Sequence, residues 1–224
     1  MTTRILAFAL ALALASPAAL GANDERLKNA QAVLEEMAEA FDTGIPRSLL
    51  QKAECVVIIP SVRRAALGIG GQYGRGYMVC RKDDRTSWSA PAGIRIEGGS
   101  VGLQIGGSAT DLVMLVMNER GADRLMSSRF TVGGEASVAA GPVGRQATAQ
   151  TDATMMAEIL AWSKSRGVFA GISLQGSTLR TDGGENEELY GRELGTREII
   201  EGDLAVPDAA KGLLAALRQY ASGS

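Results

Sequence analysis

Apolar residues at helical spacing dominate the segment that follows residue 23. They recur every three or four positions between residues 24 and 42, as on one face of a helix: Leu27, Ala30, Leu34, Met37 and Phe41. Asn23 stands where an N-cap residue is preferred, and Gly44 stands where a helix commonly stops. We therefore predict a helix over 24–42 and a second, short helix from Pro46 to about Ala53.

The middle of the chain changes to short apolar runs separated by glycine and polar residues. The run Cys55–Ile59, ended by Pro60, is typical of a buried strand. We predict further strands near 65–71, 76–81, 92–98, 100–106 and 110–117. The connections are shorter than the dozen or so residues that a parallel crossover needs, so neighbouring strands should pair antiparallel.

The second half of the chain mixes both patterns. We predict a short helix over Glu119–Ser127, and a final helix that Pro207 opens and that runs to Tyr220. Strands are predicted at 130–132, 136–140 and 168–175. The apolar residues of 154–162 fit a helix and a strand equally well, so both stay open.

Glycine is frequent, at 28 of 224 residues, and it lies inside the predicted strands. The stretch SRGVFAGISLQGS at 165–177 is one of four segments with this texture. Because glycine weakens a strand interior unless the sheet bends or another group comes close, these segments predict strong curvature. The predicted fold class is α+β, a strongly curved, mostly antiparallel sheet or half-closed barrel with amino-terminal and carboxy-terminal helices packed against it.

The glycine-rich loops do not match a nucleotide-binding motif. From Gly68 the pattern is G-x-G-G-x-x-G, and Tyr73 occupies the position where a dinucleotide fingerprint needs its last glycine. No loop continues into the G-K-[ST] sequence of a P-loop. Backbone curvature explains these glycines better, and no cofactor is predicted.

The inventory of reactive side chains excludes most enzyme classes. The chain lacks histidine, which removes histidine-based nucleophilic pairs, general bases and imidazole metal sites. A carboxylate-based lipid enzyme would need Asp111, Glu135 or Asp152 to converge on one pocket, and nothing in their spacing requires that. We predict a protein that is not an enzyme and that has no metal site.

The first residues have the pattern of a secretory signal peptide. Arg4 precedes an apolar run from Ile5 to Ala15, and small residues follow up to Ala22. The run has about half of the roughly 20 residues that a membrane-spanning helix needs, although a retained anchor is the alternative. We predict a signal peptide over 1–22 and one domain over 23–224. No cysteine follows the cleavage region, so we expect an exported protein, periplasmic or associated with the cell envelope, without a lipid anchor.

Cys55 and Cys80 are the only cysteines, and disulfides persist in an exporting compartment. A bond between them would close a loop of about 25 residues and stabilise the fold by roughly 3 kcal/mol on the chain-entropy model. Two buried thiols at strand positions are the alternative.

Without the leader the chain has 22 basic and 25 acidic residues, so it has no long-range attraction to nucleic acid. A local excess of positive charge nevertheless lies within 60–85, and arginine matches phosphate oxygens well. The candidate lipid-binding residues are Arg63, Arg64, Arg75, Arg81, Lys82 and Arg85, with Tyr73 and Tyr77. The alternative is that these are ordinary turn-borne charges and packed tyrosines.

Nine segments in a fixed order closely resemble the SYLF-domain family, over roughly residues 45–191. They are Ile45-Pro46, CVVIIPSV at 55–62, GGQYGRG at 70–76, WSAP at 88–91, GGSVGLQIGG at 98–107, TDLVMLVMN at 110–118, FTVGGEASVAAGPVGR at 130–145, SRGVFAGISLQGS at 165–177 and Tyr190-Gly191. Together with the leader, the chain resembles a bacterial exported member of this family.

The resemblance implies a phospholipid-binding module without enzymatic activity. Eukaryotic members of the family are associated with phosphoinositide membranes, and some bind actin filaments, which has no counterpart in a bacterial envelope. Their amino-terminal helix contributes to membrane contact, whereas six acidic residues lie between 23 and 42 here. We therefore expect this helix to pack its apolar face on the sheet.

Two hypotheses about function follow. The first is a peripheral protein that contacts phospholipid headgroups through the basic patch. The alternative is a structural or protein-interaction scaffold that contacts another envelope protein without binding lipid directly.

Overall fold

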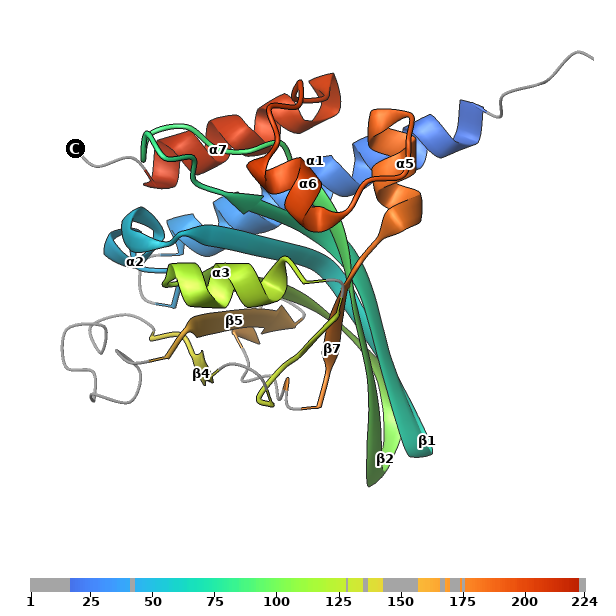
Figure 1. Cartoon of the computed structure of the whole chain (residues 1–224). Coiled ribbons are helices and arrows are strands. Elements are labelled where there is room, and N and C mark those ends of the chain that lie inside the picture. Colours follow the sequence, from blue (N-terminus) through green and yellow to red (C-terminus); the bar gives the residue numbers. More distant parts are fainter. Residues whose placement is uncertain are drawn as a thin grey trace, which may run out of the picture.

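The computed structural model describes residues 17–40, 43–127, 129–134, 137–142, 157–165, 168–169, 174 and 176–221, with the backbone alone at 17–20, 66–69, 100–106 and 168–169. Figure 1 shows one strongly curved sheet with helices on both of its faces. Two long strands, β1 (Cys55–Cys80) and β2 (Ala92–Val116), form its centre.

β1 folds back on itself. Its two end residues, Cys55 and Cys80, are joined by a disulfide and have Cα atoms 3.9 Å apart. β2 pairs antiparallel with β1 along nearly its whole length, from Val116 opposite Cys55 to Ala92 opposite Met78. Each end of β2 therefore lies beside an end of β1, and the two strands form one folded-back ribbon whose tip lies near residues 67–69 of β1.

The prediction of six separate strands in this region was wrong. The segments 55–59, 65–71 and 76–81 belong largely to β1, and the other three lie in β2. Glycine lets the backbone bend while the ladder of hydrogen bonds continues, so a bend need not end a strand.

Pro60 also fails to end its strand. The register slips between Ile59 and Val62, and Ser61 takes a positive φ of 54° in this bulge. The amide of Ser61 donates a hydrogen bond to Oδ1 of Asp111 at 2.8 Å, which fixes the bulge against β2.

Shorter strands extend the sheet on both sides of the central ribbon. β7 (Thr178–Thr181) pairs with the first half of β2, and β3 (Arg129–Thr131) pairs with β7. β5 (Ile159–Ser165) pairs with the second half of β2. Beyond it lie β4 (Val138–Ala140), parallel to β5, and β6 (Val168–Phe169), antiparallel to it.

These strands test one open prediction and one strand prediction in part. Within 154–162, the residues from Ile159 onward form a strand, while 154–156 lie outside the described residues. Of the predicted strand 168–175, β6 covers the first two residues, and 170–173 and 175 lie outside the described residues.

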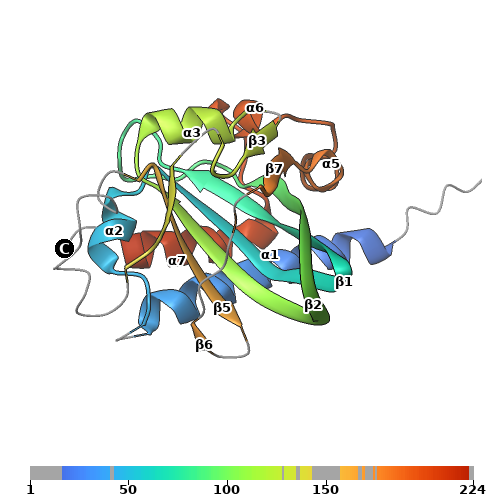
Figure 2. The same ribbon diagram turned by 90° about the horizontal axis from the view of Figure 1, so that it is seen from below.

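Helices cover both faces of the sheet. They are α1 (Pro17–Glu39), α2 (Arg47–Lys52), α3 (Glu119–Leu125), α5 (Gly183–Tyr190), α6 (Thr196–Glu201), the 3₁₀ turn η2 (Asp208–Ala210) and α7 (Lys211–Ala221). Figures 1 and 2 show α1 and α7 on one face and α3 and α6 on the other. The predicted fold class is confirmed, whereas α5 and α6 were not predicted because their sequences are short and polar.

Alternating residues of β1 supply the two apolar cores. Val56 and Ile58 face the core under α1 and α7, while Val57 and Ile59 face the core that α3 and α6 cover. This period of two is that of a strand buried on both faces. No helix within the described residues combines the length and the apolar character needed to cross a membrane.

α1 packs its apolar face on the sheet, as expected. Leu27, Ala30, Leu34 and Met37 are all at most 1% exposed. The prediction that Asn23 caps this helix was wrong, because α1 begins at Pro17 and Asn23 lies within it, almost fully buried.

Replacing Cys55 and Cys80 together by alanine should lower the free energy of unfolding by about 3 kcal/mol, because the bond closes the 25-residue separation between the ends of β1. Denaturant unfolding of the oxidised protein, the reduced protein and the double variant measures this effect. Neutral substitutions change the free energy of unfolding by up to about 0.5 kcal/mol. A difference no larger than this between the oxidised protein and the double variant would contradict the expectation.

Candidate functional site

The eight candidate lipid-binding residues fall into three places, of which the first two adjoin and the third lies apart. Arg63, Arg64 and Tyr73 lie near the tip of the β1 ribbon. Arg75 and Tyr77 enter a buried polar cluster between α1, β1 and α5. Arg81, Lys82 and Arg85 lie beyond the other end of β1, next to the disulfide.

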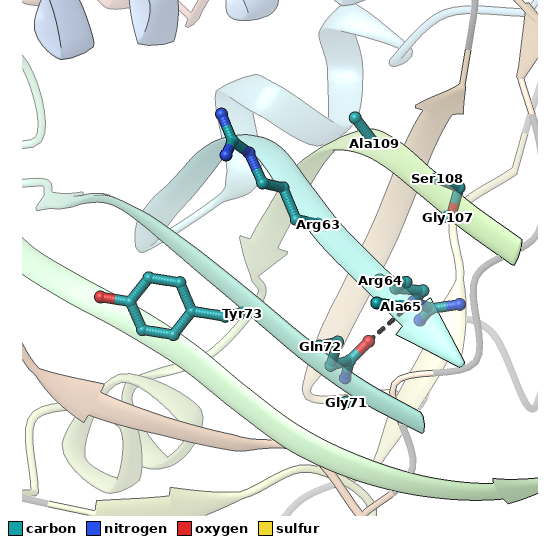
Figure 3. A pocket seen from close by; sticks show the side chains of 9 residues that line it. All are labelled: Arg63, Arg64, Ala65, Gly71, Gln72, Tyr73, Gly107, Ser108 and Ala109. Atoms are coloured by element: carbon teal, nitrogen blue, oxygen red, sulfur yellow. Dashed lines mark hydrogen bonds between the residues drawn. The ribbon is translucent and has the colours of Figure 1, made fainter. Parts of the chain in front are cut away.

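The first place is an open groove with a volume of about 670 Å³, which we call the tip groove. Figure 3 shows its lining residues on three neighbouring ribbons, the two halves of β1 and the second half of β2. Small residues form most of its floor, namely Ala65, Gly71, Gly107, Ser108 and Ala109. Their lack of bulk leaves backbone and two guanidinium groups accessible.

The two arginines of the tip groove differ in their contacts and in their exposure. Arg64 donates from Nε to Oε1 of Gln72 at 2.8 Å, across the fold of β1, and partial burial lowers its pKa. Arg63 is exposed and has no ion-pair partner among the residues that the structure describes. Tyr73 beside them is 48% exposed and is the only large hydrophobic residue exposed to this degree within the described part.

A second pocket, of about 400 Å³, shares Arg63 and Tyr73 with the tip groove. It lies between β1 and the start of α1, which contributes Glu25 and Arg26. Arg75 also lines this pocket. Three guanidinium groups thus meet here, but the carboxylates described next neutralise two of them.

The buried polar cluster is centred on Glu185 of α5, whose side chain is 1% exposed. Glu185 forms ion pairs with Arg26 and with Arg75, the latter at 3.3 Å, and accepts a hydrogen bond from the hydroxyl of Tyr77. Arg75 also donates from Nη2 to Oδ1 of Asp182 at 2.9 Å. Helix α1 is thereby joined through charges to β1 and α5.

The pKa values of this cluster follow from these contacts. The hydrogen bond to Asp182 raises the pKa of Arg75 well above its usual range, and burial beside Glu185 raises that of Tyr77. Burial alone would raise the pKa of Asp182, but its hydrogen bond to Arg75 and the charge of that arginine lower it on balance. Arg75 is therefore a structural residue rather than a free cation.

The third place is stabilised by contacts of its own. Arg81 donates to the carbonyl oxygens of Ala53 at 3.0 Å and Ala221 at 2.8 Å and lies 4.5 Å from the ring centre of Trp88. The other two basic residues of this group form ion pairs, Lys82 with Asp203 and Arg85 with Glu54.

The basic residues predicted as one patch do not form one surface. Cys55 and Arg63 are eight residues apart on β1, which corresponds to about 25 Å at the rise of a strand. Arg81, Lys82 and Arg85 therefore cannot join the tip groove. After Arg63, β1 turns at the tip and runs back to Cys80, which is bonded to Cys55. Arg63 therefore lies near the tip, and Arg81 lies at the opposite end of the ribbon, although the two are close in sequence.

Arg26, Asp182 and Glu185 were not among the sequence candidates. They come from α1 and α5, and Glu185 is 159 residues from Arg26. No regular spacing in the sequence indicates that these three residues meet. The acidic sequence of α5 is typical of a helix exposed to solvent. Among the described residues, no group of three potential metal ligands converges.

Replacing Glu185 by glutamine should lower the free energy of unfolding by about 3 kcal/mol, because an amide cannot balance the buried charges of Arg26 and Arg75. Chemical denaturation measures the change. Glu187→Gln on the exposed face of α5 is the matched control and should change it by less than about 0.5 kcal/mol. Equal effects of the two variants would contradict a central role for Glu185.

Acid should destabilise the protein partly through Asp182. Its pKa is lower in the folded chain than in the unfolded chain, so its contribution is present above the unfolded value of about 3.9 and is lost as pH falls through the folded value. Unfolding free energy should therefore fall below about pH 4, and less steeply in Asp182→Asn. Identical slopes in the two proteins between roughly pH 2 and 4 would contradict this.

Comparison with known proteins agrees with the resemblance in the sequence. A family model described as "Ysc84: Las17-binding protein actin regulator" matches residues 97–220, more than half of the chain. The curated relatives include an SH3 domain-containing protein of Schizosaccharomyces pombe, 39% identical over 75% of this chain and 40% of that protein. Protein YSC84 of Saccharomyces cerevisiae is 37% identical over 80% of this chain and 39% of its own length.

A mammalian relative shows the same similarity. The human SH3 domain-containing YSC84-like protein 1 is 32% identical over 86% of this chain and 58% of its own length. The chain thus spans about 40% of the fungal relatives and somewhat more than half of the mammalian one. These relatives are fungal and mammalian, so they give no support to the predicted bacterial exported member. The residues that the family model matches contain most of β2 and the elements that follow it, and the chain belongs to the Ysc84/SYLF family.

Proposed function

We propose that the protein is a non-enzymatic phospholipid-binding module that contacts anionic headgroups through the tip groove. The observation that carries the proposal is the exposure of Tyr73 beside Arg63, a cation without an ion-pair partner in the described part of the chain. A guanidinium group matches phosphate oxygens, and tyrosine is favoured at the level of lipid headgroups.

Two further features support this assignment of the site. The candidate arginines outside the tip groove, Arg75, Arg81 and Arg85, are held by carboxylates or by backbone carbonyls, so their charges are less available to a membrane. The apolar face of α1 is buried against the sheet, so this helix does not offer that face to lipid. The tip groove is the remaining candidate among the eight residues.

Binding of a protein partner is the second candidate function. The matching family is described as a Las17-binding actin regulator, and several relatives carry an SH3 domain in their names. This chain covers less than two thirds of each of them, so partners recognised elsewhere in those proteins need not apply to it. Co-sedimentation with actin filaments in the absence of lipid tests this candidate directly.

Location is a separate proposal. The leader-like residues 1–22 suggest export to a cell envelope, and a fusion of these residues to a reporter enzyme would show whether they direct secretion. The lipid proposal does not depend on the result, because it concerns the groove alone.

Vesicle binding should respond to the charge of Arg63. Neutralising it in Arg63→Gln should weaken binding to anionic vesicles about fivefold, since one basic residue near an anionic surface contributes about 1 kcal/mol. Co-sedimentation with vesicles of phosphatidylcholine alone, and of phosphatidylcholine mixed with phosphatidylglycerol, measures the partition coefficient at low and physiological salt.

Arg120→Gln is the matched control, because Arg120 is exposed on α3, on a face of the sheet away from α1, and is outside the tip groove. It should leave the partition coefficient unchanged within about twofold. Absence of wild-type binding to both vesicle types at low salt would refute the proposal, as would equal effects of the two variants.

A further inference from the structure

We propose that the tip of the folded-back β1–β2 ribbon, residues 66–70 and 100–106, inserts into the acyl region of an anionic phospholipid bilayer. The tip groove at its base would remain at the level of the headgroups. This inference rests on the proposed function and adds to it the depth and orientation of binding.

The first observation is an uncharged sequence at the tip. Neither 65–74 nor 98–110 contains a charged residue, although the chain as a whole is 21% charged. Both stretches carry large aliphatic residues between glycines, namely Leu67, Ile69, Val101, Leu103 and Ile105. The strand register pairs Leu67 with Ile105 and Ile69 with Val101, so aliphatic positions of the two strands are neighbours.

The second observation is the position of the tip. Figure 1 shows the common end of β1 and β2 extending past the helices and the shorter strands. Several described residues around its base are exposed on both strands, namely Ala65, Gly71, Gly99, Gly107 and Ala109, whereas Gly70 is buried. A projecting segment without charge, bordered by exposed small residues, is typical of a contact surface.

The charges at the base indicate a membrane as the occupant. Arg63 and Arg64 flank the tip on β1. Of the nearest acidic residues on β2, Glu97 forms an ion pair with Arg95 at 2.6 Å, while Asp111 is hydrogen-bonded to the Ser61 amide and keeps its charge. From the tip inward, the uncharged apolar stretch is followed by Arg64 and then by Arg63 and Tyr73 at about the same level. In an anionic bilayer, hydrocarbon is likewise followed by the interfacial region where aromatic side chains and phosphate groups lie.

The dimensions agree with this arrangement. Arg63 and Leu67 are four residues apart, about 13 Å along an extended strand. The headgroup region of one leaflet is roughly 5–8 Å thick. With Arg63 at the phosphates, the tip would pass the headgroups by about 5 Å, comparable to the burial depth of interfacial elements.

Tryptophan placed at two depths tests the insertion. Leu103→Trp lies at the tip and Tyr73→Trp at its base, while the native Trp88 and Trp162 are 5% and 2% exposed and supply a constant background. With anionic vesicles brominated on the acyl chains, the emission of Leu103→Trp should shift to the blue and be quenched strongly. Tyr73→Trp should be quenched less by deep bromines than by bromines near the headgroup.

A charge at the tip gives an independent readout. Leu103→Asp should weaken binding to anionic vesicles at least about tenfold, because a carboxylate is costly among acyl chains. Ala215→Asp, on the exposed face of α7, adds the same charge elsewhere and should have little effect.

The outcomes separate this inference from the proposed function. Bound protein with unquenched Leu103→Trp would overturn insertion, and so would Leu103→Asp that binds normally. Either result would leave headgroup contact intact. If the wild-type protein does not bind anionic vesicles at all, both proposals fail.

Discussion

The close approach of the two halves of β1 is the constraint on which the rest of the structure depends. A Cβ atom at Gly76 would lie 2.7 Å from the Cα of Ile59, and one at Gly74 would lie 2.9 Å from Cγ2 of the same residue. Only glycine permits this distance without displacing backbone. The disulfide closes one end of the fold, and the Arg64–Gln72 hydrogen bond crosses it near the other.

The fold of β1 also divides the charges into structural and accessible ones. Arg75 lies on the second half of β1, where it meets Asp182 and Glu185, whose side chains are 6% and 1% exposed. There, loss of one partner leaves a buried charge and is costly. Lys82 pairs with Asp203 in solvent, where such a pair contributes little. Similar residue types within eight positions thus have different roles because of their surroundings.

Sequence reasoning recovered what local pattern determines. The periodicity of Leu27, Ala30, Leu34 and Met37 identified the helix and its buried face, and glycine content indicated the curved sheet. Contacts between segments far apart in the sequence could not be predicted from local patterns. The partner of Arg75 comes from a segment 107 residues later, and the continuity of β1 through Pro60 depends on a bulge that Asp111 fixes from β2. Grouping the arginines by sequence proximity failed for the same reason.

An overall negative charge is compatible with an anionic binding partner in this architecture. Charges separated by more than about 8 Å are largely screened at physiological ionic strength. Glu54 and Asp203 lie with the third basic group, about 25 Å along β1 from Arg63. The potential at the tip groove therefore depends on its own residues rather than on the sum over the chain. The glycines that fold β1 determine this local field, because they bring the two halves of the strand together at the groove while leaving its ends far away.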